Sequence, residues 1–194
     1  VKQNKDSYID VLHWGWAHNI AVATEPVIFA AYDHSGCNLE NRLSIEEVDD
    51  VLTVQMQEGY AESIRKTAKD KEKLTENDPI CSVCRYSFCV MASGKVFPCA
   101  GWQNNVIGDL NRQTVQEVWE TSDKIKELRQ IKWSRFSQCV DCKDRGYCTV
   151  CMMWNSNENS DGDPFRINEH RCNVAAITHR KVDSVLQEIY PAEE

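Results

Sequence analysis

The sequence predicts an α+β fold, and three features of the chain support this prediction. Helix-capping signals recur along the chain, for example where Ser44 and Thr114 precede a glutamate three positions later. Short apolar runs separated by turn residues are concentrated between residues 85 and 110, which is typical of short strands. Nine of the ten cysteines lie between Cys81 and Cys172, which indicates a small cysteine-rich domain.

The first part of the chain predicts a helix, a strand and a second helix. Apolar residues recur at helical spacing over residues 6–19. Residues 21–31 form an apolar run that predicts a buried strand, although Pro26 weakens its first half. The capping box that begins at Ser44 predicts a helix that continues to about Glu58.

Residues 60–78 are charged and helix-prone, and they end at the helix-breaking run Asn77-Asp78-Pro79. This composition predicts a linker followed by a domain boundary. We therefore expect four parts: a helix–strand–helix unit over 1–59, a helical linker over 60–78, a cysteine-rich domain over 79–172 and a C-terminal helix over 173–194.

The cysteine-rich part predicts a β-hairpin followed by short helices. Residues 85–91 and 95–99 read as two strands joined by an Ala-Ser-Gly turn, and 106–110 as one more short strand. The remaining expected elements are a helix that follows Thr114, a helix over 122–132, a polar loop over 155–164 and a helix over 173–190.

The chain's bulk properties exclude several classes of function. Its 194 residues carry a net charge of −8 with no long basic run, which argues against nucleic acid as a main partner. No apolar run approaches the roughly 20 residues of a membrane span. No signal peptide is visible behind the polar start at Val1, so we expect a cytoplasmic, reducing environment. The start at valine indicates a fragment of a longer protein.

The cysteine spacing predicts bound metal. The downstream run is Cys139-x2-Cys142-x5-Cys148-x2-Cys151 followed by Cys172, and the upstream run is Cys81-x2-Cys84 followed by Gly94-x4-Cys99. Thiolates are soft ligands that select iron–sulfur clusters, zinc or cuprous copper. A four-iron cluster takes four thiolates, so these eight cysteines match two clusters.

The other two cysteines are expected to be free. Cys89 lies in an apolar stretch and reads as a small core residue, and Cys37 lies alone in a loop. Spacing by itself leaves zinc and iron–sulfur clusters equally open. Disulfides are disfavoured because no export signal is visible.

The segment from Cys81 to Cys172 resembles a SPASM domain, the C-terminal auxiliary-cluster module of many radical S-adenosylmethionine enzymes. Cys84-x9-Gly94-x4-Cys99 is similar to the first half of the family pattern, and Cys139-x2-Cys142-x5-Cys148 to the second half. One departure is that two residues, not three, separate Cys148 from the next cysteine. Many peptide-modifying members use this shorter form.

The resemblance implies which cysteines share a cluster. The inner auxiliary cluster would be held by Cys81, Cys84, Cys99 and Cys151, with Cys89 as a substitute for one of the first two. The outer auxiliary cluster would be held by Cys139, Cys142, Cys148 and Cys172. Both would be [4Fe-4S] clusters, although a fragment expressed in air can carry zinc instead.

Residues 38–47 resemble the last barrel units of peptide-modifying radical S-adenosylmethionine enzymes, through the run Asn38-Leu39-x-x-Arg42-Leu43-Ser44. The expected fold is therefore the C-terminal α/β part of a partial barrel followed by a SPASM domain. The chain contains no Cys-x3-Cys-x2-Cys, the motif that binds the cluster for S-adenosylmethionine cleavage, so that cofactor is expected only in the complete enzyme.

The resemblance implies an electron-transfer and substrate-positioning module of an enzyme that modifies a peptide or protein, either a peptide maturase or a relative of the sulfatase maturases. In sulfatase maturases a catalytic Asp directly follows the Gly-x4-Cys cysteine, whereas this chain has Ala100 there, which argues against formylglycine formation. The expected partners are a peptide or protein substrate and an electron donor such as flavodoxin or ferredoxin. The alternatives are a small-molecule radical dehydrogenase and a zinc-stabilised interaction domain without redox function.

Overall fold

The computed structural model describes residues 1–191. The α-helices of this range are α1 (Tyr8–Ala17), α2 (Ile45–Gln55), α3 (Ala61–Glu72), α4 (Val115–Thr121), α5 (Asp123–Gln130), α6 (Ser137–Val140), α7 (Met152–Glu158) and α8 (Glu169–Ile189). The strands are β1 (Cys89–Val90), β2 (Lys95–Phe97) and β3 (Gly108–Asp109). Short 3-10 turns are η1 (Lys2–Asn4), η2 (Cys37–Asn41), η4 (Trp133–Arg135) and η5 (Arg145–Tyr147), and η3 (Met56–Tyr60) is a π-turn.

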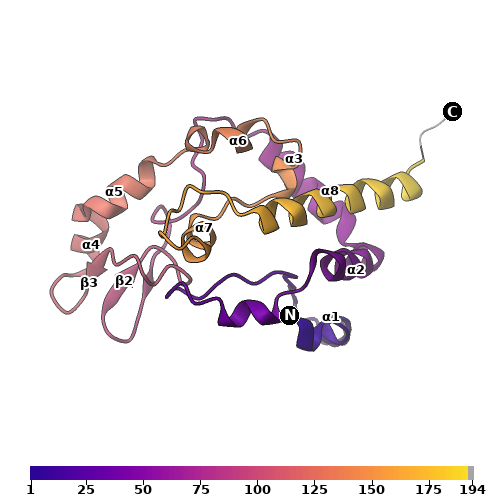
Figure 1. Ribbon diagram of the computed structural model, residues 1–194, viewed down its shortest axis with the longest axis horizontal. Coiled ribbons are helices and arrows are strands. Elements are labelled where there is room, and N and C mark those ends of the chain that lie inside the picture. Colours follow the sequence, from indigo (N-terminus) through magenta and orange to yellow (C-terminus); the bar gives the residue numbers. More distant parts are fainter. Residues whose placement is uncertain (192–194) are drawn as a thin grey trace.

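Helices combined with one small antiparallel sheet confirm the predicted α+β class. Figure 1 shows the sheet near α4 and α5 at one end of the molecule, and α8 extending toward the other end. None of the helices within residues 1–191 combines the length and the apolar character that crossing a membrane requires.

Helix α1 confirms the first predicted helix, but its buried face is narrower than the apolar spacing indicates. Leu12 is completely buried, whereas Trp16 and Ile20 are exposed. Tyr8 attaches the start of the helix to α2, because its hydroxyl donates a hydrogen bond of 3.0 Å to the carbonyl oxygen of Val51.

Residues 21–31 contain no strand, so the prediction of a buried strand there is wrong. Pro26 has no backbone N–H to donate, and no strand within residues 1–191 pairs with this segment. Side chains bind its carbonyl groups instead. Arg42 donates two hydrogen bonds of 2.7 and 2.9 Å to the carbonyl of Ile28, and Asn38 donates one of 2.7 Å to the next carbonyl. The segment is therefore irregular and is held by side chains.

Helix α2 begins at the predicted capping box, in which the Ser44 hydroxyl and the Glu47 carboxylate each accept a hydrogen bond from the other residue's amide. At Gly59 the backbone φ of +87° lies in the left-handed region that glycine tolerates, and the chain turns there into α3. Helix α3 lies within the expected helical linker and packs against η5 and α8. An added Cβ on Gly146 in η5 would lie only 3.0 Å from the carbonyl oxygen of Ala68 in α3.

The three strands confirm the predicted hairpin and the short strand after it, with shorter bounds than the sequence indicates. Strand β2 pairs antiparallel with β1 and with β3, so that Cys89 lies opposite Phe97. The turn between β1 and β2 uses Gly94, whose φ of +78° again favours glycine. The capping box at Thr114 then begins α4 as predicted.

The polar run 155–164 was expected to be a loop, but its first four residues belong to α7. Asn155 and Asn157 are buried there because their side chains bind carbonyl groups. Asn155 donates to Pro164 at 2.9 Å, and Asn157 donates to the carbonyls of Ala30 and Gly101 at 3.1 and 3.2 Å. These asparagines are thus buried, although their composition predicts exposure to solvent, because protein carbonyl groups accept their hydrogen bonds.

A buried ion pair between Arg42 and Glu158 joins the N-terminal part of the chain to α7. Their side chains are only 14% and 12% exposed. The Glu158 carboxylate also accepts hydrogen bonds from the backbone of Ala30 at 3.3 Å and from Asn168 at 2.5 Å. Asn168 caps α8, which begins four residues earlier than predicted and therefore carries Cys172 in its first turn.

The buried apolar residues form two cores, and the segment 139–154 contributes to both. The first core includes Val96, Trp102, Ile125, Trp133, Phe136 and Met152 together with Cys84 and Cys139. The second core includes Val48, Leu52, Met56, Tyr147, Trp154, Val174 and Val182. The division of the chain into the four expected parts stays a prediction.

Candidate metal centre

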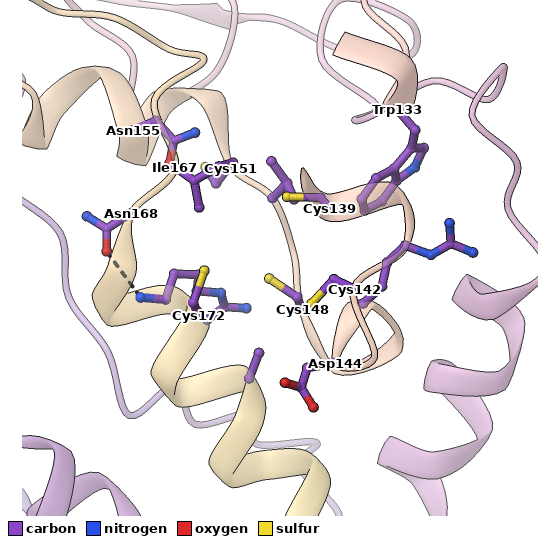
Figure 2. Close-up of a pocket in the computed structure, with 14 residues that line it drawn as sticks. Trp133, Cys139, Cys142, Asp144, Cys148, Cys151, Asn155, Ile167, Asn168 and Cys172 are labelled. Atoms are coloured by element: carbon purple, nitrogen blue, oxygen red, sulfur yellow. Dashed lines mark hydrogen bonds between the residues drawn. The ribbon is translucent and has the colours of Figure 1, made fainter. Parts of the chain in front are cut away.

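Five cysteines line one cavity between the segment 139–151 and the start of α8 (Figure 2). Four of them make up what we call the outer group: Cys139, Cys142, Cys148 and Cys172. The cavity has a volume of about 70 Å³, whereas one water molecule needs about 10–15 Å³. The cavity is therefore larger than a single water molecule requires.

The thiols of the outer group lie close enough to influence one another's ionisation. Burial raises the pKa of Cys139 to about 11. Three neighbouring thiols add to this rise: Cys148, Cys172 and Cys142. Burial also raises the pKa of Cys148 and of Cys172, and Cys142 contributes to both shifts. The four sulfurs thus form one electrostatically coupled set.

A second set of four thiols consists of three that precede residue 139 and one at the start of α7. We call it the inner group: Cys81, Cys84, Cys99 and Cys151. Burial raises the pKa of Cys84 to about 11, and the thiols of Cys99 and Cys81 contribute. Burial likewise raises the pKa of Cys99, with contributions from Cys151 and Cys81. These shifts link the hairpin, the Cys81–Cys84 turn and the start of α7.

Backbone amides in the inner group favour the thiolate form. Cys151 is the N-cap residue of α7, where the amides of Trp154 and Met153 oppose the rise that burial causes in its pKa. The amides of Gly101 and Trp102 act in the same way on Cys99. Two of the four inner thiols therefore have donors that would stabilise their negative charge on binding metal.

Cys151 also lines the outer cavity, so this cavity alone does not separate it from the outer group. Its thiol interacts with those of Cys81 and Cys99. These interactions agree with the inner group that the family resemblance implies, and the membership of Cys151 stays a prediction. Cys37 is exposed and Cys89 lies in β1. Neither is a leading cause of the raised pKa of Cys84, Cys99, Cys139, Cys148, Cys151 or Cys172.

Each group has the number of thiols that one four-iron cluster takes. Within residues 1–191, no three His, Cys, Asp or Glu side chains converge closely enough to hold one metal ion. A closed zinc site would also take four thiolates, each at about 2.3 Å from the ion, whereas a four-iron cluster distributes its thiolates over four irons. The donor set of each group thus fits iron–sulfur chemistry.

Comparison with known families reaches the same chemistry. Residues 81–143 match the family model of the SPASM domain, described as an iron-sulfur cluster-binding domain. The match confirms the prediction of iron–sulfur cluster binding, but not the number of clusters or their ligands. The match covers about a third of the chain and ends before Cys148, Cys151 and Cys172. No curated protein and no solved structure matches the chain.

Three basic side chains near the thiols were missed by the sequence reasoning. Arg129 donates a hydrogen bond of 2.7 Å to the carbonyl of Cys84, and Lys71 donates one of 3.1 Å to the carbonyl of Cys148. Arg171 lines the outer cavity. The sequence could have indicated only Arg171, because it directly precedes Cys172. Lys71 and Arg129 are distant in sequence from the cysteines that they contact, and the tertiary fold brings them together.

Proposed function

We propose that this chain is the auxiliary-cluster module of a radical S-adenosylmethionine enzyme that modifies a peptide or protein. In this proposal the inner and outer groups each bind one [4Fe-4S] cluster, and the module transfers electrons and positions the substrate. One observation gives the proposal most of its support: Cys139, Cys142, Cys148 and Cys172 line one cavity, and the thiols of Cys81 and Cys151 act on that of Cys99. The resemblance to the SPASM family implies two sets of four that include these neighbours.

The chain's own residues would bind the clusters, keep water from them and stabilise their thiolate ligands. A bound four-iron cluster supplies a one-electron donor or acceptor. The first core packs around Cys84 and Cys139 and keeps water from those sulfurs. The amides beside Cys99 and Cys151 oppose the rise that burial causes in the pKa of these thiols, and they would stabilise the thiolates that hold a cluster.

The peptide-modifying role rests on the resemblance of residues 38–47 and on the short Cys148-x2-Cys151 spacing. Cleavage of S-adenosylmethionine is assigned to residues outside this chain, which has no Cys-x3-Cys-x2-Cys. We propose a peptide or protein substrate, and a flavodoxin or ferredoxin as electron donor, in the cytoplasm.

The test is the content of metal and acid-labile sulfide per chain, measured on protein purified without oxygen and reconstituted with iron and sulfide. The proposal predicts about eight irons and eight sulfides. About two zinc ions without sulfide would replace it with a structural zinc domain. If eight irons are found, activity of the complete enzyme on a peptide or on a small molecule separates a maturase from a dehydrogenase.

A further inference from the structure

Arg171 lies between the two cysteine groups. It occupies the first turn of α8, directly before Cys172, and lines the outer cavity. It also lines a second hollow, whose wall includes Cys151, Met153 and Trp154 on the inner side. One side chain therefore borders the outer cavity and a hollow that contains the inner thiol Cys151.

The charge of Arg171 is largely buried and only weakly neutralised by the protein. Its side chain is 17% exposed, and its guanidinium lies 5.5 Å from the centre of the Trp154 ring. The carboxylate paired with it is that of Glu25, at 3.6 Å on a side chain that is 64% exposed, so solvent screens this pair. The buried Nε atom has no hydrogen-bond partner within residues 1–191.

An unpartnered buried N–H is uncommon and needs an explanation. Here it belongs to a cation on the wall of a cavity lined by thiols. A bound cluster would bring thiolate and sulfide acceptors to that wall, which can accept such a donor.

The charge of Arg171 lies beside a thiol of each group. Arg171 lines the outer cavity together with Cys148, and it lines the second hollow together with Cys151. Lys71 and Arg129 each contact the backbone of one candidate ligand, since they donate hydrogen bonds to the carbonyls of Cys148 and Cys84.

We propose that Arg171 is a positioning residue shared by the two groups, whose charge raises the reduction potentials of both bound clusters. This inference rests on the proposed function. Each cluster is already negatively charged through its four thiolates, and reduction adds one electron from a reduced donor protein without a proton. A nearby fixed cation stabilises the reduced form more than the oxidised form. Removing the charge should therefore make both clusters harder to reduce.

The test is a dithionite titration of the reconstituted protein followed by electron paramagnetic resonance, which reports both potentials. Arg171→Gln is expected to lower the equilibrium constant for reduction about tenfold at both clusters, which corresponds to 59 mV for one electron. Arg171→Lys should restore most of the shift, because it restores the charge. Iron and sulfide contents are measured on every variant.

The matched control is Arg180→Gln on the same helix. Arg180 is 66% exposed and pairs with Asp49 at 2.7 Å, and nine helical residues place it about 13 Å further along α8. That distance exceeds the screening length of about 8 Å at physiological salt, so both potentials should stay at the wild-type values. Glu25→Gln removes the negative charge paired with Arg171 and should raise both reduction potentials slightly. This variant tests the inference if Arg171→Gln does not fold.

The outcomes separate this inference from the proposed function. Wild-type protein without iron and sulfide removes the function and the inference together. Wild-type protein with both clusters, and Arg171→Gln with unchanged potentials, overturns the inference alone. A shift at one cluster, or an equal shift in Arg180→Gln, also overturns it, because the charge would then not be shared or not be specific.

Discussion

The outer and inner cysteine groups are assembled from very different lengths of chain. Three outer thiols come from the ten residues 139–148, and the fourth comes from the first turn of α8. The inner thiols span residues 81–151 and come from three separate segments. The outer site therefore depends mainly on local spacing, whereas the inner site requires the hairpin and α7 to be in place.

The two groups also differ in their exposure. The outer group has two exposed thiols, Cys142 and Cys172, beside the buried Cys139, whereas the inner group has one exposed thiol, Cys81, and Cys84 is completely buried in the first core. This difference teaches that the outer cluster would be the more accessible to solvent and reagents. The inner cluster would be more tightly coupled to folding, since metal binding and folding share the same free energy.

The largest expected effect comes from removing two outer thiols, Cys139 and Cys142. The double variant Cys139→Ala/Cys142→Ala should lose about half of the iron and sulfide, about four of each. The matched control is Cys37→Ala/Cys89→Ala, which should keep the full content. Both contents are measured after reconstitution. Full iron in the first variant would show that the outer group is assigned wrongly, and a loss in the control would show that Cys37 or Cys89 binds metal.

A smaller effect is expected from the buried ion pair that holds the N-terminal segment against α7 and α8. Glu158→Ala leaves Arg42 buried without its partner, which should lower the free energy of unfolding by about 3–5 kcal/mol. Urea unfolding followed by circular dichroism measures this change. The same carboxylate holds Asn168 at the start of α8, so the outer cluster should be lost at lower urea than the inner one.

The control for that variant is Asp70→Asn, which removes an ion pair with Lys73 between two exposed side chains. Exposed pairs contribute little to stability, so its unfolding curve should match the wild type. An equal destabilisation by the two variants would contradict a special role for the buried pair.

The smallest effect concerns the hairpin that carries the inner thiol Cys99. Hydrogen bonding from Lys95, followed by that from Asn111, lowers the pKa of Asp109 from 3.8 to about 2. Because the folded pKa is lowered, this contribution to stability is complete above pH 3.8 and is lost as the pH falls through about 2. Asp109→Asn should therefore lower the melting temperature slightly and by the same amount throughout pH 5–8. A difference that shrinks between pH 8 and pH 5 would show that this carboxyl titrates near neutrality.

Local signals predicted much of the fold. The capping boxes at Ser44 and Thr114 fixed the starts of two helices, because their hydrogen bonds lie within four residues. Gly94 marked the hairpin turn through a backbone conformation that few other residues adopt. The spacing within residues 139–148 likewise identified three outer thiols, since residues so close in sequence can converge without long-range information.

Features set by distant contacts could not be predicted in this way. The segment 21–31 has strand-like composition, but Arg42 and Asn38 bind its carbonyl groups in place of a neighbouring strand. Asn155 and Asn157 have loop-like composition, but they bind carbonyls inside the protein. The expected membership of Cys151 in the inner group comes from the family resemblance, because spacing alone would have placed it with the cysteines of residues 139–148.

The membership of Cys151 is thus the most direct test of the division into two groups. Two double variants should be compared by iron, sulfide and the electron paramagnetic resonance of the reduced protein: Cys81→Ala/Cys99→Ala and Cys99→Ala/Cys151→Ala. Our account predicts identical results, about four irons and four sulfides with one unchanged outer-cluster spectrum. A different spectrum or lower iron in the variant that lacks Cys151 would mean that Cys151 binds the outer cluster, and would contradict the division.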